Sequence, residues 1–198
     1  HYYVTTFFYP EVRKPETTLV PPVLRREILA AAPSDGEHVL VYQTSESTGD
    51  LPAILRSLDL PFVVYGYRRD IRGDAVEGNV TYRPFNEARF IEDLASARAV
   101  IANGGFTLLG EAVHLGKPVL SIPVKSQFEQ VLNGHYLEGL GYGYTADELD
   151  ASTARFFLSS LEAYRKALAG YDRSGSNGRL FALLDERLDR IAAGVEPM

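Results

Sequence analysis

Short apolar runs recur along the chain and are separated by polar, glycine-containing segments and by stretches with helical periodicity. Short apolar runs bounded by turn residues are typical of strands buried in a sheet. They predict strands at residues 38–42, 61–65, 79–82, 99–102 and 119–122. Helical patterns follow at residues 50–58, 87–97, 151–169 and 179–193. This alternation predicts an α/β fold built on a parallel sheet.

The segment 103–133 is the most informative part of the sequence. Asn103–Gly105 ends the preceding apolar run and opens a helix, and glycines there allow a sharp turn that presents N–H groups to an anion. Along that helix, Thr107, Glu111 and His114 share one face. A lone carboxylate one turn into a helix, beside a glycine loop, suits a ribose diol. A solvated helix residue would have the same spacing.

Polar side chains gather again where the following helix begins. Ser126 and Glu129 have the spacing of a capping box, which gives Glu129 a structural role at the helix start. Gln127, Gln130 and Asn133 add three amides to the same region. Because side-chain amides both donate and accept hydrogen bonds, they suit the hydroxyls of a sugar.

A hydroxyl-rich loop follows the strand at residues 38–42. It contains Thr44, Ser45 and Ser47 and leads into the next helix. Loops at this position of an α/β sheet commonly bind phosphate. The loop matches neither the GxGxxG fingerprint nor a P-loop, so an ordinary connection is an equally good interpretation.

Composition narrows the classes of function. The chain has 198 residues, a net charge of −6 and no cysteine, which excludes a disulfide scaffold and a thiolate site. The charge argues against a nucleic-acid surface, but not against a small anion held by local N–H dipoles. The four histidines are scattered without ligand spacing, so no metal site is predicted. No apolar run approaches the roughly 20 residues that span a bilayer.

Residues 90–133 resemble the donor-binding half of GT-B glycosyltransferases, above all the family of the peptidoglycan N-acetylglucosaminyltransferase. The matching elements are FIEDL, a strand of small residues, GGFTLLGEAVHLGKPVLSIP and a glutamine-rich helix start that ends in asparagine. The likeness extends over about residues 20–145. It implies a Rossmann-like parallel sheet with helices on both faces, which is one half of a GT-B fold. It also implies a UDP-sugar donor, no cofactor and no metal.

The resemblance assigns roles by motif position. Glu111 matches the glutamate that holds the ribose, although Gly110 stands where the family usually has serine or threonine. Phe85 is the candidate for the uracil edge, and a purely structural place in the core is the alternative. The glycine-loop backbone faces the diphosphate, and the glutamines touch the donor sugar. The predicted nucleotide-sugar site comprises Thr44, Ser45, Ser47, Phe85, Asn103, Gly104, Gly105, Phe106, Thr107, Glu111, Gln127 and Gln130.

The two ends of the chain suggest part of a longer protein. Residues 1–22 combine aromatic residues with spaced prolines, so we expect an interdomain linker and the remnant of an N-terminal domain. Residues 23–175 are expected to form the nucleotide-sugar-binding domain, and residues 176–198 a C-terminal helix. By resemblance, the catalytic base and any membrane contact belong to the missing domain. We expect a cytoplasmic protein, or one peripheral at the inner face of the membrane, whose isolated chain binds donor without transferring sugar.

Two other functions fit the same residues. In a split enzyme, this chain would be a separate donor-binding subunit, and an upstream domain in the same reading frame would exclude that arrangement. A UDP-sugar epimerase shares the architecture but needs acid–base residues around the anomeric and adjacent carbons. Glu111 and Glu129 are the candidates for that role, yet the order of glycine loop, ribose glutamate and glutamines favours a transferase.

Overall fold

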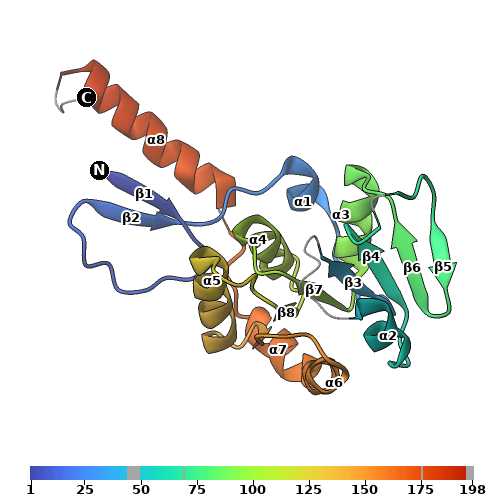
Figure 1. The fold of residues 1–198 in the computed structure, drawn as a ribbon. Helices are drawn as coiled ribbons and strands as arrows, with labels where there is room; N and C mark the ends of the chain where they lie inside the picture. Colours follow the sequence, from blue (N-terminus) through green and yellow to red (C-terminus); the bar gives the residue numbers. More distant parts are fainter. Residues whose placement is uncertain (44–49, 69, 175, 195–198) are drawn as a thin grey trace. The chain divides into compact units, whose positions relative to one another are not determined.

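The computed structural model describes residues 1–43, 50–68, 70–174 and 176–194 (Figure 1). They form two compact units. One contains His1–Arg25 and the described residues from Asp172 onward, and the other contains Arg26–Tyr171. The domain boundaries expected after residues 22 and 175 stay predictions. The larger unit carries the sheet that was expected from the apolar runs.

The sheet of the larger unit has seven strands in the order β5-β6-β4-β3-β7-β8-β9 (Figure 1). All neighbours are parallel except β5 and β6, which form an antiparallel pair at one edge. The strands are β3 (Val39–Tyr42), β4 (Phe62–Tyr65), β5 (Ala75–Glu77), β6 (Val80–Arg83), β7 (Ala99–Ala102), β8 (Val119–Ser121) and β9 (Gly143–Thr145).

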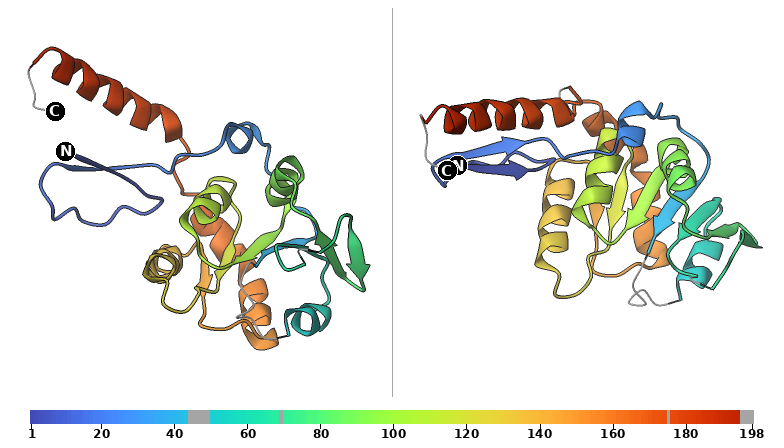
Figure 2. Two further views of the ribbon diagram at one scale, coloured as in Figure 1. Left: turned by 45° about the horizontal axis from the view of Figure 1, so that its top comes forward. Right: turned by 90° about the horizontal axis from the view of Figure 1, so that it is seen from above.

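Helices cover both faces of this sheet (Figures 1 and 2). On one face lie α1 (Arg26–Ala30), α3 (Glu87–Ser96), α4 (Phe106–His114) and α5 (Phe128–Gly139). On the other face lie α2 (Leu51–Arg56), α6 (Ala151–Ser159) and α7 (Leu161–Leu168). The predicted α/β, Rossmann-like parallel sheet with helices on both faces is therefore confirmed.

Burial explains why the central strands are apolar throughout. All four residues of β7 are buried, because helices cover the sheet on both sides. Val39, Val41 and Ile101 belong to the apolar core that also contains Leu51 and Leu55 from α2 and residues of α6 and α7. This packing fixes the carboxyl ends of β3 and β7 side by side, and those ends position the candidate site.

Two elements differ from the sequence-based expectation. The single helix predicted at residues 151–169 is two helices, with Ser160 serving as the C-cap of α6 and the N-cap of α7. The edge strand β5 was not predicted. It pairs with β6 through a turn at Gly78, where φ is +63°, a conformation that glycine adopts without strain.

The smaller unit consists of two parallel strands and a helix. Strands β1 (Tyr2–Thr5) and β2 (Thr17–Val20) pair in parallel, within the segment expected to be a linker. The Tyr3 hydroxyl donates to the carbonyl of Leu183 on α8 (Ser176–Ala192) at 3.4 Å. The Asn177 side chain bonds both backbone groups of Leu24, at 2.8 and 2.7 Å. Within the described ranges, no helix combines the length and apolarity needed to cross a membrane.

Lys117 is a buried cation in the loop between α4 and β8. Its side chain is 2% exposed, and its Nζ donates to the carbonyl of Ser34 at 2.6 Å. The Asp35 carboxylate lies 3.9 Å from Nζ. Burial lowers the pKa of Lys117 to about 8, against the raising effect of Asp35 and with a smaller lowering effect of Arg165.

We expect the contribution of Lys117 to stability to rise with pH. Because its pKa falls from 10.5 unfolded to about 8 folded, the unfolded chain binds more protons between these values, and the free energy of unfolding increases with pH there. From about pH 7 to pH 9.5, wild type should gain about 2 kcal/mol relative to Lys117→Met. Urea unfolding across this range measures the gain, with Lys125→Met as the exposed control. If the difference in unfolding free energy between wild type and Lys117→Met does not change with pH, the lowered pKa of Lys117 is contradicted.

Candidate functional site

The strand order creates a crevice at the carboxyl ends of β3 and β7. The chain leaves β3 toward β4 on one side of the sheet and leaves β7 toward β8 on the other. In open α/β sheets, ligands bind at such a switch point. A cavity of about 340 Å³ lies there. It is lined by Tyr42, Ala102, Asn103, Gly105, Phe106, Thr107, Leu108, Glu129 and Gln130.

The first turn of α4 forms one wall of this cavity. The N-cap position is occupied by Gly105, which supplies no side chain to the first-turn N–H groups. Those groups have no intrahelical acceptor in any helix, and with the helix dipole they favour an anion. The preceding Gly104 has φ of +87°. Asn133 donates from Nδ2 to the Gly104 carbonyl at 3.1 Å, and Asn103 donates to the Ile122 carbonyl at 3.2 Å, so two buried amides fix the loop.

The opposite wall comes from the start of α5, through Glu129 and Gln130. The predicted capping box is wrong: Ser126 has φ of +70°, and Gln127 occupies the N-cap without a side-chain cap bond. Glu129 is therefore the second residue of the helix and lines the cavity. The Gln130 Oε1 accepts from the Val124 N–H at 2.9 Å, which orients its amide. A carboxylate and an amide are thus available for sugar hydroxyls.

The described cavity lining contains no lysine or arginine, and its one charged side chain is Glu129. An anion in this cavity would therefore be held by backbone N–H groups and the α4 dipole, not by a cation from the described lining. Glu129 carries negative charge, which suits the hydroxyl end of a ligand. This polarity matches a molecule with an anionic part near α4 and an uncharged polyol near α5.

The structure brings together five of the predicted residues around the cavity: Asn103, Gly105, Phe106, Thr107 and Gln130. Gly104 is buried in the same loop. Gln127 is exposed at the start of α5 and is not part of the lining. Thr44, Ser45 and Ser47 lie outside the described residues. That any of these residues contacts a ligand stays a prediction.

Glu111 and Phe85 lie outside the cavity lining. Glu111 is 1% exposed on α4, so the alternative of a solvated helix residue is wrong, while its predicted ribose contact stays untested. Phe85 is 61% exposed between β6 and α3, so the alternative of a purely core residue is wrong. Its ring centroid lies 5.8 Å from that of Phe90.

Four lining residues were outside the predicted site: Tyr42, Ala102, Leu108 and Glu129. Tyr42 ends β3 and pairs in register with Ala102, the last residue of β7. The sequence could have indicated Tyr42, because it is the final residue of an apolar strand. The carboxyl ends of parallel strands meet at one edge of the sheet, where ligands bind. For Glu129, the spacing to Ser126 favoured a cap and concealed the cavity-lining position.

Two glycosyltransferases of known structure have a similar fold. The spinosyn forosaminyltransferase SpnP matches 94% of this chain and 55% of its own, with a TM-score of 0.67 and 14% identity. UGT2 of Phytolacca americana, complexed with UDP-2fluoro-glucose and pterostilbene, matches 89% of this chain and 47% of its own, with a TM-score of 0.61 and 15% identity. The fold is that of the GT-B glycosyltransferases.

Sequence comparison identifies the family of the chain. The pattern of glycosyl transferase family 1 matches residues 1–162, and the chain belongs to this family. A curated relative is the UDP-N-acetylglucosamine--N-acetylmuramyl-(pentapeptide) pyrophosphoryl-undecaprenol N-acetylglucosamine transferase of Methylobacterium nodulans. It is 27% identical over 136 residues, which cover 65% of this chain and 36% of the relative. The chain thus spans about a third of the curated relative and about half of each solved chain.

Proposed function

We propose that this chain is the donor-binding half of a GT-B glycosyltransferase that transfers a hexose-type sugar from a UDP-sugar without a metal. The observation that carries the proposal is the cavity at the β3–β7 switch point. It places the first turn of α4 opposite Glu129 and Gln130 of α5. The diphosphate would lie at α4 and the sugar hydroxyls at α5.

The residues suit the charge that develops during transfer. The bond between the anomeric carbon and the diphosphate oxygen breaks with both electrons going to the diphosphate, and the acceptor oxygen forms a new bond to that carbon. Negative charge therefore grows at the α4 end, where N–H dipoles stabilise it. The acceptor proton must pass to a base. We place that base and the acceptor in a domain outside this sequence, which makes the isolated chain a donor-binding but inactive unit.

Two of the similar proteins support a uridine nucleotide. The Phytolacca americana structure holds UDP-2fluoro-glucose, and the name of the Methylobacterium nodulans enzyme gives UDP-N-acetylglucosamine as its substrate. We extend the UDP-sugar, but neither particular sugar, to this chain. We also propose that the whole protein is cytoplasmic or peripheral at the inner face of the membrane, through its other domain.

The test is calorimetric titration of the 198-residue chain with UDP and ADP, repeated on Glu111→Gln. We expect UDP to bind, ADP to bind more weakly, and the substitution to weaken UDP by about 1–3 kcal/mol, the loss of a hydrogen bond to a charged group. Glu162→Gln, an exposed position on α7 across the sheet, is the matched charge control. Failure of the wild-type chain to bind either nucleotide would contradict the donor assignment. An unchanged affinity in Glu111→Gln would contradict only the ribose contact.

A further inference from the structure

Phe85 presents an exposed aromatic ring at the junction between β6 and α3. Its side chain is 61% exposed, yet its ring centroid lies 6.5 Å from that of Tyr65 and 5.8 Å from that of Phe90. Both supporting rings are buried. An aromatic ring that is supported on one side and open on the other is a stacking platform for a flat heterocycle, and a nucleobase gains about 1–3 kcal/mol from such stacking.

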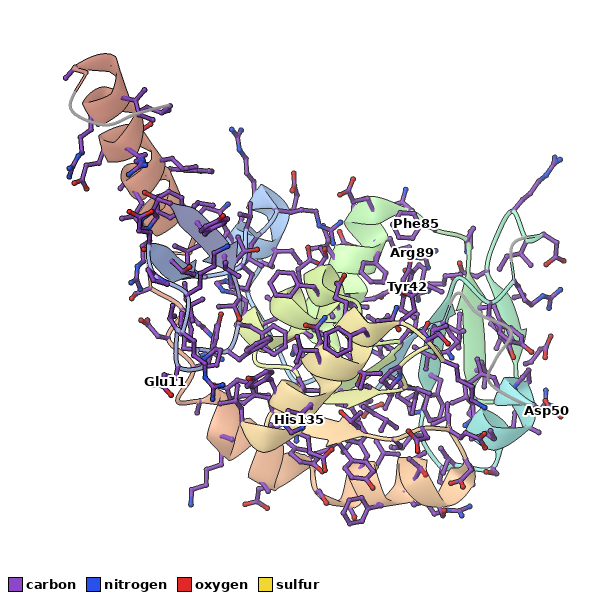
Figure 3. All side chains as sticks on the ribbon, turned by 60° about the vertical axis from the view of Figure 1, so that its left-hand side comes forward. Glu11, Tyr42, Asp50, Phe85, Arg89 and His135 are labelled. Atoms are coloured by element: carbon purple, nitrogen blue, oxygen red, sulfur yellow. The ribbon has the colours of Figure 1, made fainter. Side chains whose placement is uncertain are left out.

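The platform is connected to the cavity by aromatic contacts. The Phe90 ring contacts the rings of both Phe85 and Tyr42, with a centroid distance of 5.5 Å to Tyr42. Tyr42 lines the cavity at the end of β3. Phe85 and Tyr42 are both labelled in Figure 3, which shows the elements from which they project. Phe85 is therefore linked to the cavity edge at Tyr42 through one buried ring, so a base on Phe85 and an anionic group in the cavity could belong to one ligand.

Asp74 holds this junction from both flanks. It immediately precedes β5, and its carboxylate accepts from Arg89 Nη1 and Nη2 at 2.8 and 2.7 Å. The same carboxylate lies 3.5 Å from Arg83 Nε. Arg83 ends β6 and Arg89 is in the first turn of α3, so one carboxylate from the residue before β5 ties together the residues on either side of Phe85. Asn86 adds a cap by accepting from the Arg89 N–H at 3.0 Å.

The contacts of Asp74 are too exposed to be a major source of stability. The Asp74 side chain is 30% exposed and that of Arg89 is 43% exposed. Ion pairs at such positions typically contribute about 0–1 kcal/mol to folding. A bidentate arginine–carboxylate pair does, however, fix orientation, because the planar guanidinium matches both oxygens. The ion pair therefore fixes the position of the β6–α3 junction and contributes little to the stability of the sheet.

We propose that Asp74, acting through Arg83 and Arg89, is a positioning residue for a nucleobase subsite at Phe85. The proposal rests on the function proposed above, and it assigns to a residue outside the cavity the control of base recognition. Without the ion pairs of Asp74 with Arg83 and Arg89, the β6–α3 junction that carries Phe85 is no longer held in place. The loop before α4 is unaffected. The base-dependent part of the affinity is therefore affected, and the phosphate-dependent part is not.

The experiment compares UDP, ADP and inorganic pyrophosphate binding to the 198-residue chain and to Asp74→Asn. We expect UDP affinity to fall about fivefold or more, with pyrophosphate affinity and the unfolding midpoint unchanged and with the preference for UDP over ADP reduced. Asp74→Glu, which keeps a carboxylate, should restore most of the UDP affinity. The matched control is Glu77→Gln on the same hairpin, because the Glu77 carboxylate accepts from Arg56 and Arg68 rather than from Arg83 or Arg89.

Several outcomes would overturn the proposal. UDP affinity within twofold of wild type in Asp74→Asn would remove the positioning role, as would equal losses for UDP and pyrophosphate or an equal effect of Glu77→Gln. If UDP binds and Glu111→Gln weakens it while Asp74→Asn does not, the donor assignment stands and only this inference fails. If the wild-type chain binds neither nucleotide, both fail together.

Discussion

Gly104→Ala should destabilise the chain by about 2–5 kcal/mol, while Gly105→Ala should leave it folded with little change. Gly104 has φ of +87°, which an L side chain rarely adopts. A Cβ there would lie 2.7 Å from Ser121 Oγ and 3.2 Å from the Gln130 carbonyl oxygen. The left-handed conformation and the overpacking each contribute, and the second neighbour is backbone that cannot turn away. Urea unfolding of the two variants measures the difference.

The neighbouring glycine is a matched control for this prediction. Gly105 has φ of −62°, and a Cβ built on it meets nothing within 4 Å. The two substitutions add the same methyl group to adjacent residues of one loop. If both variants unfold at the same urea concentration as wild type, the conclusion that Gly104 packs too tightly against β8 and α5 to admit a Cβ is contradicted.

Asp93→Ala should be the more damaging of two carboxylate deletions, with a loss of about 3–5 kcal/mol. Asp93 accepts from the Tyr65 hydroxyl at 2.5 Å, and both of its oxygens accept from Arg83. The side chains of Arg83 and Asp93 are 19% and 13% exposed, and Tyr65 is fully buried. Burial, and then the bond to Asp93, raise the pKa of Tyr65, so its hydroxyl stays a donor. Removing Asp93 leaves a largely buried guanidinium without its close partner.

Asp74→Ala provides the contrast, because it removes a carboxylate from a neighbouring and more exposed ion pair. We expect it to cost less than about 1 kcal/mol. Thermal and urea unfolding of both variants at neutral pH compare the two losses. Equal losses would mean that burial does not separate the roles of the two carboxylates.

Local pattern was enough to predict the elements that sit in the middle of the sheet. The strand at residues 99–102 was predicted to the residue, because β7 is buried on both faces and its apolar run has sharp polar ends. The helix expected at residues 87–97 was also predicted to within one residue, since its start is fixed by the Asn86 cap, a contact within one turn. The break at Ser160 was not, because neither glycine nor proline marks it and the surrounding residues continue a helical pattern.

The candidate site was predictable only where its residues are contiguous. The segment around Asn103–Thr107 carries a recognisable motif, and the structure places most of it at the cavity. Tyr42 was missed because its position depends on the pairing of β3 with a distant strand. Glu111 shows the converse limit: its helical face was read as polar, but tertiary packing buries it.

The pairing of β3 with β7 also has a consequence for how the domain assembles. It joins Val39 to Ala99, residues 60 positions apart, whereas β7 pairs with β8 across a much shorter interval. Closing the longer loop costs more chain entropy, so this seam is expected to form after the more local pairs. The cavity lies on the seam and exists only once both halves of the sheet have joined. A ligand that binds there stabilises the joined state by an amount that grows with the logarithm of its concentration above the Kd, so ligand concentration would affect the fraction of folded chains as well as occupancy.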